Sequence, residues 1–319
     1  MAEHVPETDA WMRRHNLPNA AVQNFVFMAD DWPIRVVHMP RPAADVGRHI
    51  LLITGRADFV EKYAELLHDL ADAGWGATIF DWRGQGLSRR VGKTPQHGAS
   101  PGFGLWLRDL AMMVEWAQAR AEGPLVAMAH SMGGHLLLRH LAAGGSAIAR
   151  AVLLAPMIGL QAKPLGSAIT RRIAALQVVR GKGDAFVIGG GPWQPGRPGE
   201  DRQIWLTSDI ERFRDESWWI GNYPSLALGS VTWGWLDDAF ASIDALLTRG
   251  VPEAITTPLL FQIPQVDQLV DSGATRRLVP RIAGATLLEH AGAAHELLRE
   301  SDEIRAVVLA AALAHLAGD

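Results

Sequence analysis

The chain of 319 residues contains no cysteine. This absence excludes disulfide bonds, catalysis by a thiol and metal sites built from cysteine. Positive and negative residues nearly balance, with 30 Lys and Arg against 34 Asp and Glu and a net charge of −4. The composition therefore lacks the basic excess that is typical of nucleic-acid-binding proteins. We therefore expect no nucleic acid among the partners of this protein.

Long hydrophobic runs are also missing. The most apolar stretch near the C-terminus, residues 304–318, is too short to span a bilayer and contains Arg305 and His315, so it predicts an amphipathic helix. The N-terminal residues include Glu3 and Glu7 and lack the apolar segment of a signal peptide. These features predict a cytoplasmic protein without integral membrane association.

Two motifs of common enzyme classes do not occur. The chain has no His-Glu-x-x-His pattern or comparable cluster of metal ligands, so we expect no metal. The glycine-containing segment 81–88 is not a phosphate-binding loop, because no Gly-Lys-Ser/Thr follows and its glycine spacing is wrong. We expect this segment, which contains Asp81 and Arg83, to brace a turn at a strand end rather than to carry chemistry.

What the chain does contain is an alternation of short apolar runs with amphipathic stretches. Helices are expected at 59–73, 105–120, 132–141 and 304–318. Strands are expected at 24–28, 34–38, 50–54, 77–80, 124–129, 151–155, 258–263 and 285–289. The first two should form a hairpin, and the rest predict an α/β fold with a mostly parallel sheet that helices cover on both faces.

This alternation is interrupted in the middle of the chain. Residues 157–250 lack it and hold a Gly/Pro-rich stretch, 189–199, together with six of the 12 tryptophans. We interpret this segment as an inserted cap. The expected organisation is an N-terminal extension (1–20), a first part of the core (21–156), the cap (157–250) and a second part of the core (251–319).

Ser131 is the most informative residue of the chain. It stands between the expected strand 124–129 and the expected helix 132–141, with the small residues Ala129 and Gly133 two positions away on either side. A serine in this setting is typical of the nucleophile elbow of α/β-hydrolases, where the turn is so tight that bulky neighbours would clash. Ser131 is therefore the predicted nucleophile.

A serine nucleophile needs a base and a group that orients the base, and in this fold the order along the chain is serine, acid, histidine. Asp267 follows the strand 258–263 and is the favoured acid, whereas Asp271 is expected to cap the next helix. Of the two late histidines, His295 lies in a loop that can lean over the sheet edge and is the favoured base. His290 falls at the end of the last strand.

The oxyanion hole should consist of two backbone N–H groups. One belongs to Met132, the residue after the nucleophile. The other is expected from Arg56, in the loop after the strand 50–54, where Gly55 allows a close approach of the backbone.

Together, these segments resemble the lysophospholipase and monoacylglycerol lipase branch of the α/β-hydrolases. The resemblance is carried by Gly55-Arg56 followed by Glu61-Lys62-Tyr63, by 81–88 (DWRGQGLS), 130–134 (HSMGG), 154–157 (LAPM), 267–270 (DQLV) and 292–298 (GAAHELL). It implies a serine carboxyl-ester hydrolase without a cofactor that acts on monoacyl lipids or similar apolar esters. It also implies the same three roles for Ser131, Asp267 and His295. One departure is Thr54, which replaces the histidine that the branch usually has in the oxyanion loop.

The cap is expected to select the substrate. Trp233 and Trp235 are candidate substrate-binding residues because tryptophan offers a large apolar contact area, and in an extended segment they would point to opposite sides. Alternative functions remain open: a short-chain esterase or lactonase, a peptidase or acyltransferase of the same fold, or a non-catalytic ligand-binding protein. Transient contact with a membrane surface also remains open, although no basic amphipathic helix supports it.

Overall fold

The sheet at the centre of the molecule has eight strands in the order β1-β2-β4-β3-β5-β6-β7-β8. The computed structural model describes residues 8–41, 48–162, 164–194 and 200–318. The strands are β1 Val22–Phe27, β2 Pro33–Met39, β3 His49–Ile53, β4 Gly76–Phe80, β5 Leu125–His130, β6 Ile148–Leu154, β7 Leu259–Pro264 and β8 Thr286–His290. Strand β2 runs antiparallel to β1 and β4, and all other neighbours are parallel. The expected hairpin and mostly parallel sheet are confirmed.

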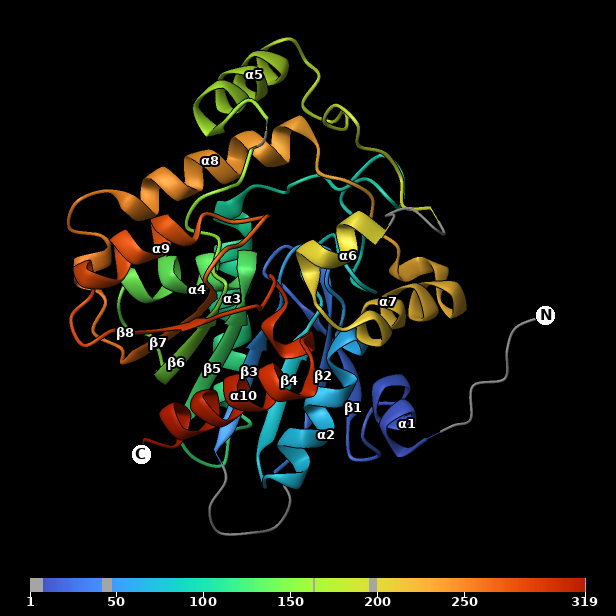
Figure 1. The fold of residues 1–319 in the computed structure, drawn as a ribbon, viewed down its shortest axis with the longest axis vertical. Helices are drawn as coiled ribbons and strands as arrows, with labels where there is room; N and C mark the ends of the chain where they lie inside the picture. The colour runs from blue at the N-terminus through green and yellow to red at the C-terminus, as the bar shows by residue number, and fades with distance from the viewer. Residues whose placement is uncertain (1–7, 42–47, 163, 195–199, 319) are drawn as a thin grey trace.

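Helices cover both faces of this sheet (Figure 1). The helices are α1 Asp9–His15, α2 Ala64–Asp72, α3 Phe103–Gln118, α4 Ser131–Ala142, α5 Ser167–Val179, α6 Glu200–Leu206, α7 Ile210–Asn222, α8 Trp233–Leu247, α9 Ser272–Leu278 and α10 Asp302–Ala317. Short 3₁₀ turns are η1 Val60–Tyr63, η2 Pro224–Leu226, η3 Pro252–Ala254, η4 Val279–Arg281 and η5 Leu297–Arg299. Helices α3 and α4 pack on one face, and α2 and α10 on the other.

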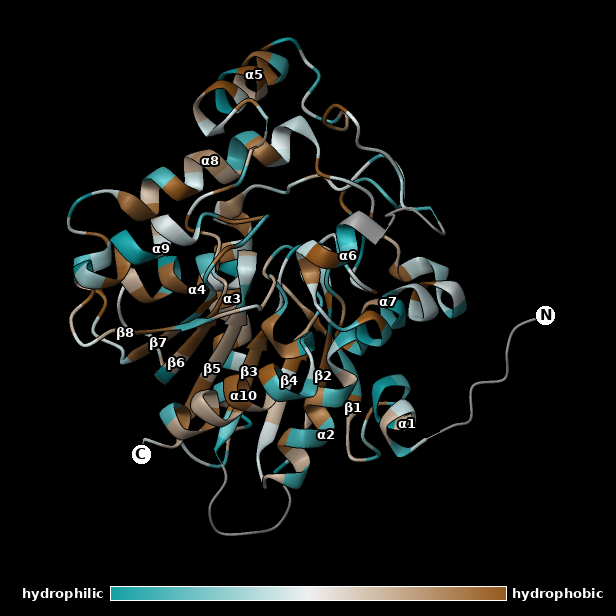
Figure 2. Cartoon of the chain, viewed as in Figure 1, coloured by the Kyte–Doolittle hydropathy of each residue, from teal (hydrophilic) through white to brown (hydrophobic). Residues whose placement is uncertain are grey.

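The burial of the strands follows from this layering. All residues of β3, β4, β5 and β7 are buried, because the central strands of a parallel sheet have no face in contact with water. Strand β1 lies at the edge and is mostly exposed. The hydropathy colouring shows the same contrast between apolar central strands and more polar outer helices (Figure 2).

The chain between β6 and β7 adds no strand to the sheet among its described residues. It forms α5 to α8, with α5 packed on α8, and Figure 1 shows these helices along one end of the sheet. Of the Gly/Pro-rich stretch 189–199, residues 195–199 lie outside the described part of the chain. So do residues 1–7 of the expected N-terminal extension, whereas its later residues form α1, which packs on α2 and α7.

The structure adds detail at two positions that the sequence singled out. Trp233 and Trp235 begin helix α8 rather than an extended segment, because Thr232 caps this helix by accepting a hydrogen bond from the Trp235 N–H (3.2 Å). Asp271 does stand at the N-cap of α9, but its side chain makes no capping hydrogen bond. Its carboxylate instead pairs with Arg277, 3.1 Å away.

Candidate active site

Ser131 occupies the sharp turn from β5 into α4. Its φ angle is +51°, a left-handed conformation that non-glycine residues rarely adopt and that is a source of local strain. A side chain at Gly133 would collide with the carbonyl oxygens of Ile53 and Thr54, because α4 begins directly against the end of β3. The turn therefore requires a glycine at Gly133, as the motif predicts.

The structure brings the three predicted side chains together. His295 Nε2 lies 2.9 Å from Ser131 Oγ, and His295 Nδ1 lies 2.6 Å from Asp267 Oδ2. The other Asp267 oxygen accepts the backbone N–H groups of Leu269 (2.7 Å) and Val270 (3.1 Å), which fixes the carboxylate. A base with one nitrogen on a hydroxyl and the other on a carboxylate can take and return a proton.

The electrostatics of the pair suit this role. Burial would lower the pKa of His295, but the charge of Asp267 and its hydrogen bond outweigh burial and raise the pKa above 6.5. Burial would likewise raise the pKa of Asp267, but His295 and the two backbone N–H groups lower it. Asp267 is thus held ionised, in the form that stabilises a protonated His295.

The other candidates for acid and base lie elsewhere. His290 Nε2 is 2.8 Å from Gln262 Oε1, and Asp271 pairs with Arg277. His130 packs against His295, with 4.8 Å between ring centroids, and burial followed by the charge of His295 lowers its pKa to about 4.

The loop after β3 has both engaged and open backbone donors. The Gly55 N–H donates to Asp58 Oδ2 at 2.7 Å. The N–H groups of Arg56 and Met132 donate to no residue that the structure describes, and both residues line the cavity that contains Ser131. This arrangement leaves the two predicted oxyanion donors available to a substrate.

Our reading of the sequence missed the support of this loop. Asp58 accepts hydrogen bonds from the Gly55 N–H and from Tyr63 Oη (2.8 Å), and pairs with Lys62 Nζ (2.8 Å). Lys62 also reaches Glu296 (2.6 Å), the neighbour of His295. The sequence pattern that could have indicated this support is the spacing of Asp58 and Lys62, an acid and a lysine four positions apart just after Gly55.

The segment 81–88 braces the same region, as expected. Trp82 Nε1 donates to the Thr54 carbonyl (2.8 Å), and Gln85 Oε1 accepts the Ala57 N–H (2.5 Å). Asp81, however, pairs with Arg35 rather than with Arg83. The loop after β3 is thereby held from two sides.

A cavity of about 610 Å³ opens onto Ser131 and His295. Its size is within the range of small-molecule sites. Most of its wall is apolar and comes from the segment between β6 and β7: Leu160, Leu165, Ile173, Val187, Ile188, Leu206, Trp233, Trp235 and Leu236. Both predicted tryptophans thus line the cavity, although they stand on one turn of a helix.

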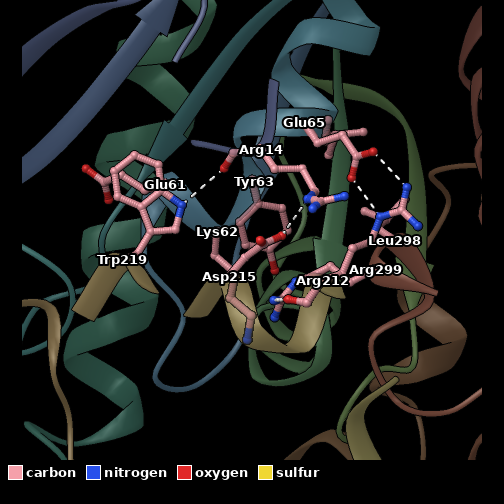
Figure 3. A pocket seen from close by; sticks show the side chains of 11 residues that line it. Arg14, Glu61, Lys62, Tyr63, Glu65, Arg212, Asp215, Trp219, Leu298 and Arg299 are labelled. Carbon is pink, nitrogen blue, oxygen red and sulfur yellow. Dashed lines mark hydrogen bonds and ion pairs between the residues drawn. The ribbon is translucent and has the colours of Figure 1, made fainter. Parts of the chain in front are cut away.

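Ion pairs attach helix α7 to α1 and α2 around a second, smaller pocket, which shares Lys62 with this cavity (Figure 3). Arg212 of α7 pairs with Glu65 of α2 (2.7 Å), and Asp215 of α7 pairs with Arg14 of α1 (3.0 Å). Trp219 Nε1 donates to the Arg14 carbonyl (3.2 Å). These contacts hold α7, which is part of the segment between β6 and β7, against α1 and α2.

No group of three or more histidine, aspartate or glutamate side chains in the described ranges could hold a metal ion. No helix in the described part of the chain is both long and apolar enough to cross a membrane.

Several known proteins are similar to this chain over most of its length. A family model described as "Serine aminopeptidase, S33" (Hydrolase_4) matches residues 44–302. The lysophospholipase L2 of Escherichia coli (strain K12) is 29% identical over 95% of this chain and 88% of its own length. A probable lysophospholipase L2 of Haemophilus influenzae is 27% identical over 85% of this chain and 84% of its own length.

Solved structures show the same fold. A soluble variant of monoglyceride lipase from Saccharomyces cerevisiae, in complex with a substrate analogue, superimposes with a TM-score of 0.71 at 20% identity, over 94% of this chain and 96% of that one. The enol-lactonase from Burkholderia xenovorans superimposes with a TM-score of 0.61 at 16% identity, over 93% and 100%. Because the family model spans most of the chain, the family predicted from the motifs is confirmed: the chain belongs to the Hydrolase_4 family of α/β-hydrolases and is a serine hydrolase.

Proposed function

We propose that this protein hydrolyses carboxylic esters of monoacyl lipids through an acyl-enzyme formed on Ser131. The observation that carries the proposal is the pair of contacts made by His295, to Ser131 Oγ (2.9 Å) and to Asp267 Oδ2 (2.6 Å), beside a largely apolar cavity. The similarity to lysophospholipases L2 supports the class of substrate.

The chemistry follows from the geometry. Ser131 Oγ attacks the ester carbonyl while its proton moves to His295 Nε2. The carbonyl oxygen becomes an oxyanion, to which the N–H groups of Arg56 and Met132 donate. His295 then gives its proton to the departing alcohol, which leaves an acyl group on Ser131. Water donates a proton to His295 and attacks the acyl group, and His295 then returns this proton to Ser131 Oγ as the fatty acid leaves.

We also propose that residues 157–250 act as a cap on a core made of 21–156 and 251–319, with 1–20 as an extension. Support comes from the packing of α5 on α8 and from the apolar cavity wall that this segment supplies. An apolar wall suits an acyl chain, because burial of apolar surface contributes about 0.8 kcal/mol per methylene group. The cytoplasmic location stays a prediction, which cell fractionation would test.

Initial rates on one panel of esters test the proposed function. The panel contains p-nitrophenyl esters from short to long chains, monoacylglycerol and lysophosphatidylcholine. We expect hydrolysis of the monoacyl lipids, a preference for long chains, and labelling by a fluorophosphonate probe that disappears in Ser131→Ala. Rates that are high only for short esters would favour the short-chain esterase or lactonase alternative. Absence of labelling in the wild-type protein would contradict a serine enzyme.

A further inference from the structure

The side chain of Arg56 carries a positive charge into the wall of the cavity. Its Nη2 donates to the Gly229 carbonyl (2.6 Å), and its guanidinium lies 5.6 Å from the ring centre of Trp235. Its Nε is buried and has no hydrogen-bond partner. No carboxylate among the described residues forms an ion pair with it, so the charge is not neutralised. Burial and then the charge of Arg202 lower the pKa of Arg56 to about 9, in keeping with this lack of a counter-charge.

Arg202 of helix α6 is the second cation of this wall. It lines the same cavity as Arg56 and is close enough for its charge to affect the Arg56 guanidinium. Its side chain is exposed and makes no hydrogen bond or ion pair with any residue that the structure describes. Among the described side chains, these two like charges lie near one another without a compensating acid, an arrangement that costs free energy.

The acids of the cavity do not compensate these arginines, because other cations hold them. Lys62 Nζ lies 2.8 Å from Asp58, 2.6 Å from Glu296 and 3.1 Å from Glu216. Arg299 pairs with Glu296 as well, at 2.7 Å. The cavity therefore has a cluster of paired acids and cations behind the base and, apart from it, the two arginines Arg56 and Arg202.

We infer that Arg56 and Arg202 form an anion subsite that binds the phosphodiester of a monoacyl phospholipid while its ester lies at Ser131. This inference rests on the proposed function and names its substrate class more closely. Guanidinium groups bind phosphate oxygens with directed, charge-assisted hydrogen bonds, and Arg56 has an unused buried donor. Arg56 is also the residue whose backbone N–H faces the reacting carbonyl in the proposed mechanism. The same residue would therefore hold both the ester and the nearby headgroup.

The test compares substrates that share one oleoyl chain: lysophosphatidylcholine, lysophosphatidylglycerol and monooleoylglycerol, all in the same neutral detergent micelles. The variants are Arg202→Gln and Arg202→Glu, because Arg202 is exposed and supplies no backbone group to the mechanism. Arg172→Gln is the matched control, since Arg172 is an exposed arginine of the same segment that does not line the cavity.

We expect the ratio of kcat/KM for the phospholipids to kcat/KM for monooleoylglycerol to fall about tenfold in Arg202→Gln. The fall should be larger in Arg202→Glu and absent in Arg172→Gln. An unchanged ratio in both Arg202 variants, with monoacyl lipids still hydrolysed, would overturn the anion subsite and leave the proposed function standing. Failure of the wild-type protein to hydrolyse any ester would instead defeat the proposed function.

Inhibition of p-nitrophenyl butyrate hydrolysis identifies the anion. Glycerophosphocholine should inhibit more strongly than inorganic phosphate, and its inhibition constant should rise about tenfold in Arg202→Gln. Alternatively, Arg202→Gln could weaken inhibition by oleate and leave inhibition by glycerophosphocholine unchanged. In that case the arginines bind the carboxylate of the fatty acid. That result would overturn the assignment to the headgroup.

Discussion

Asp58 accepts the backbone N–H of Gly55 at 2.7 Å, and this contact engages the donor that directly precedes the Arg56 N–H in the loop after β3. The carboxylate is buried and is itself held by Lys62 and Tyr63. Burial alone would raise the pKa of Asp58, but the charges of Lys62 and His130 together with the hydrogen bonds from Lys62 and Tyr63 hold it well below its usual range, so the carboxylate is an acceptor at neutral pH. Asp58 thus supports the loop in which Thr54 replaces the usual histidine.

Replacement of Asp58 by alanine should lower kcat at least tenfold with a smaller effect on KM. The reason is that a loosened loop misplaces the Arg56 N–H, and the loss of one oxyanion donor costs about 100- to 1000-fold in kcat. The measurement is kcat and KM on a soluble ester, with Asp184→Ala as control, because Asp184 is exposed and pairs only at the surface with Lys93. Equal losses of kcat in both variants would contradict a positioning role.

The pH dependence of the reaction should report His295. The base must be neutral to accept the serine proton, and the pKa of His295 is raised above 6.5 by Asp267. The rate constant kcat/KM should therefore fall as the pH is lowered through this raised pKa. In Asp267→Asn the carboxylate charge is lost, so the midpoint should move to lower pH while the maximal rate falls by about 10⁴-fold. A midpoint that moves to higher pH would rule out this assignment of the pair.

Trp233→Ala and Trp235→Ala should reduce activity on long-chain esters more than on short-chain esters. Both rings are buried at the start of α8 and line the cavity, so their removal widens the space that an acyl chain would fill. Trp205→Ala is the control, since that ring is largely exposed and does not line this cavity. The readout is the ratio of kcat/KM between a long and a short p-nitrophenyl ester. Equal losses on both esters would refute a role in chain binding.

Gly133→Ala should destabilise the fold. The added methyl group meets the backbone carbonyls of Ile53 and Thr54, which cannot move without disturbing β3, and such overpacking costs about 1–3 kcal/mol. The expected result is a fall in Tm of several degrees in a thermal melt. Gly104→Ala in helix α3 is the matched control, because open space surrounds that position and alanine favours a helix. A Tm for Gly133→Ala at or above that of the control would speak against this account of the elbow.

Local patterns in the sequence predicted most of the core. The strand β7 was expected at 258–263 and is Leu259–Pro264, and α4 was expected at 132–141 and is Ser131–Ala142. Such elements can be predicted from the sequence because the apolar periodicity and the turn residues that define them lie within a few positions of one another. The helical start of α8 was not predicted, although threonine is a residue type that commonly caps helices. The alternating pair Trp233 and Trp235 resembles a strand, but the Thr232 cap and the packing of the helix on the core decide its conformation.

The sequence by itself determined the fold class and the order of Ser131, Asp267 and His295, because strand ends of a parallel sheet meet at one edge wherever they occur in the chain. Only the tertiary structure decided that His295 Nε2 lies 2.9 Å from Ser131 Oγ, although the two residues are 164 positions apart in the sequence. It also decided that Asp58 accepts the Gly55 N–H, and that Arg56 and Arg202 share one cavity wall without a counter-charge from any described side chain. Interactions between charged side chains depend on their distance in space. The sequence pattern alone therefore does not predict which acidic side chain pairs with which basic one.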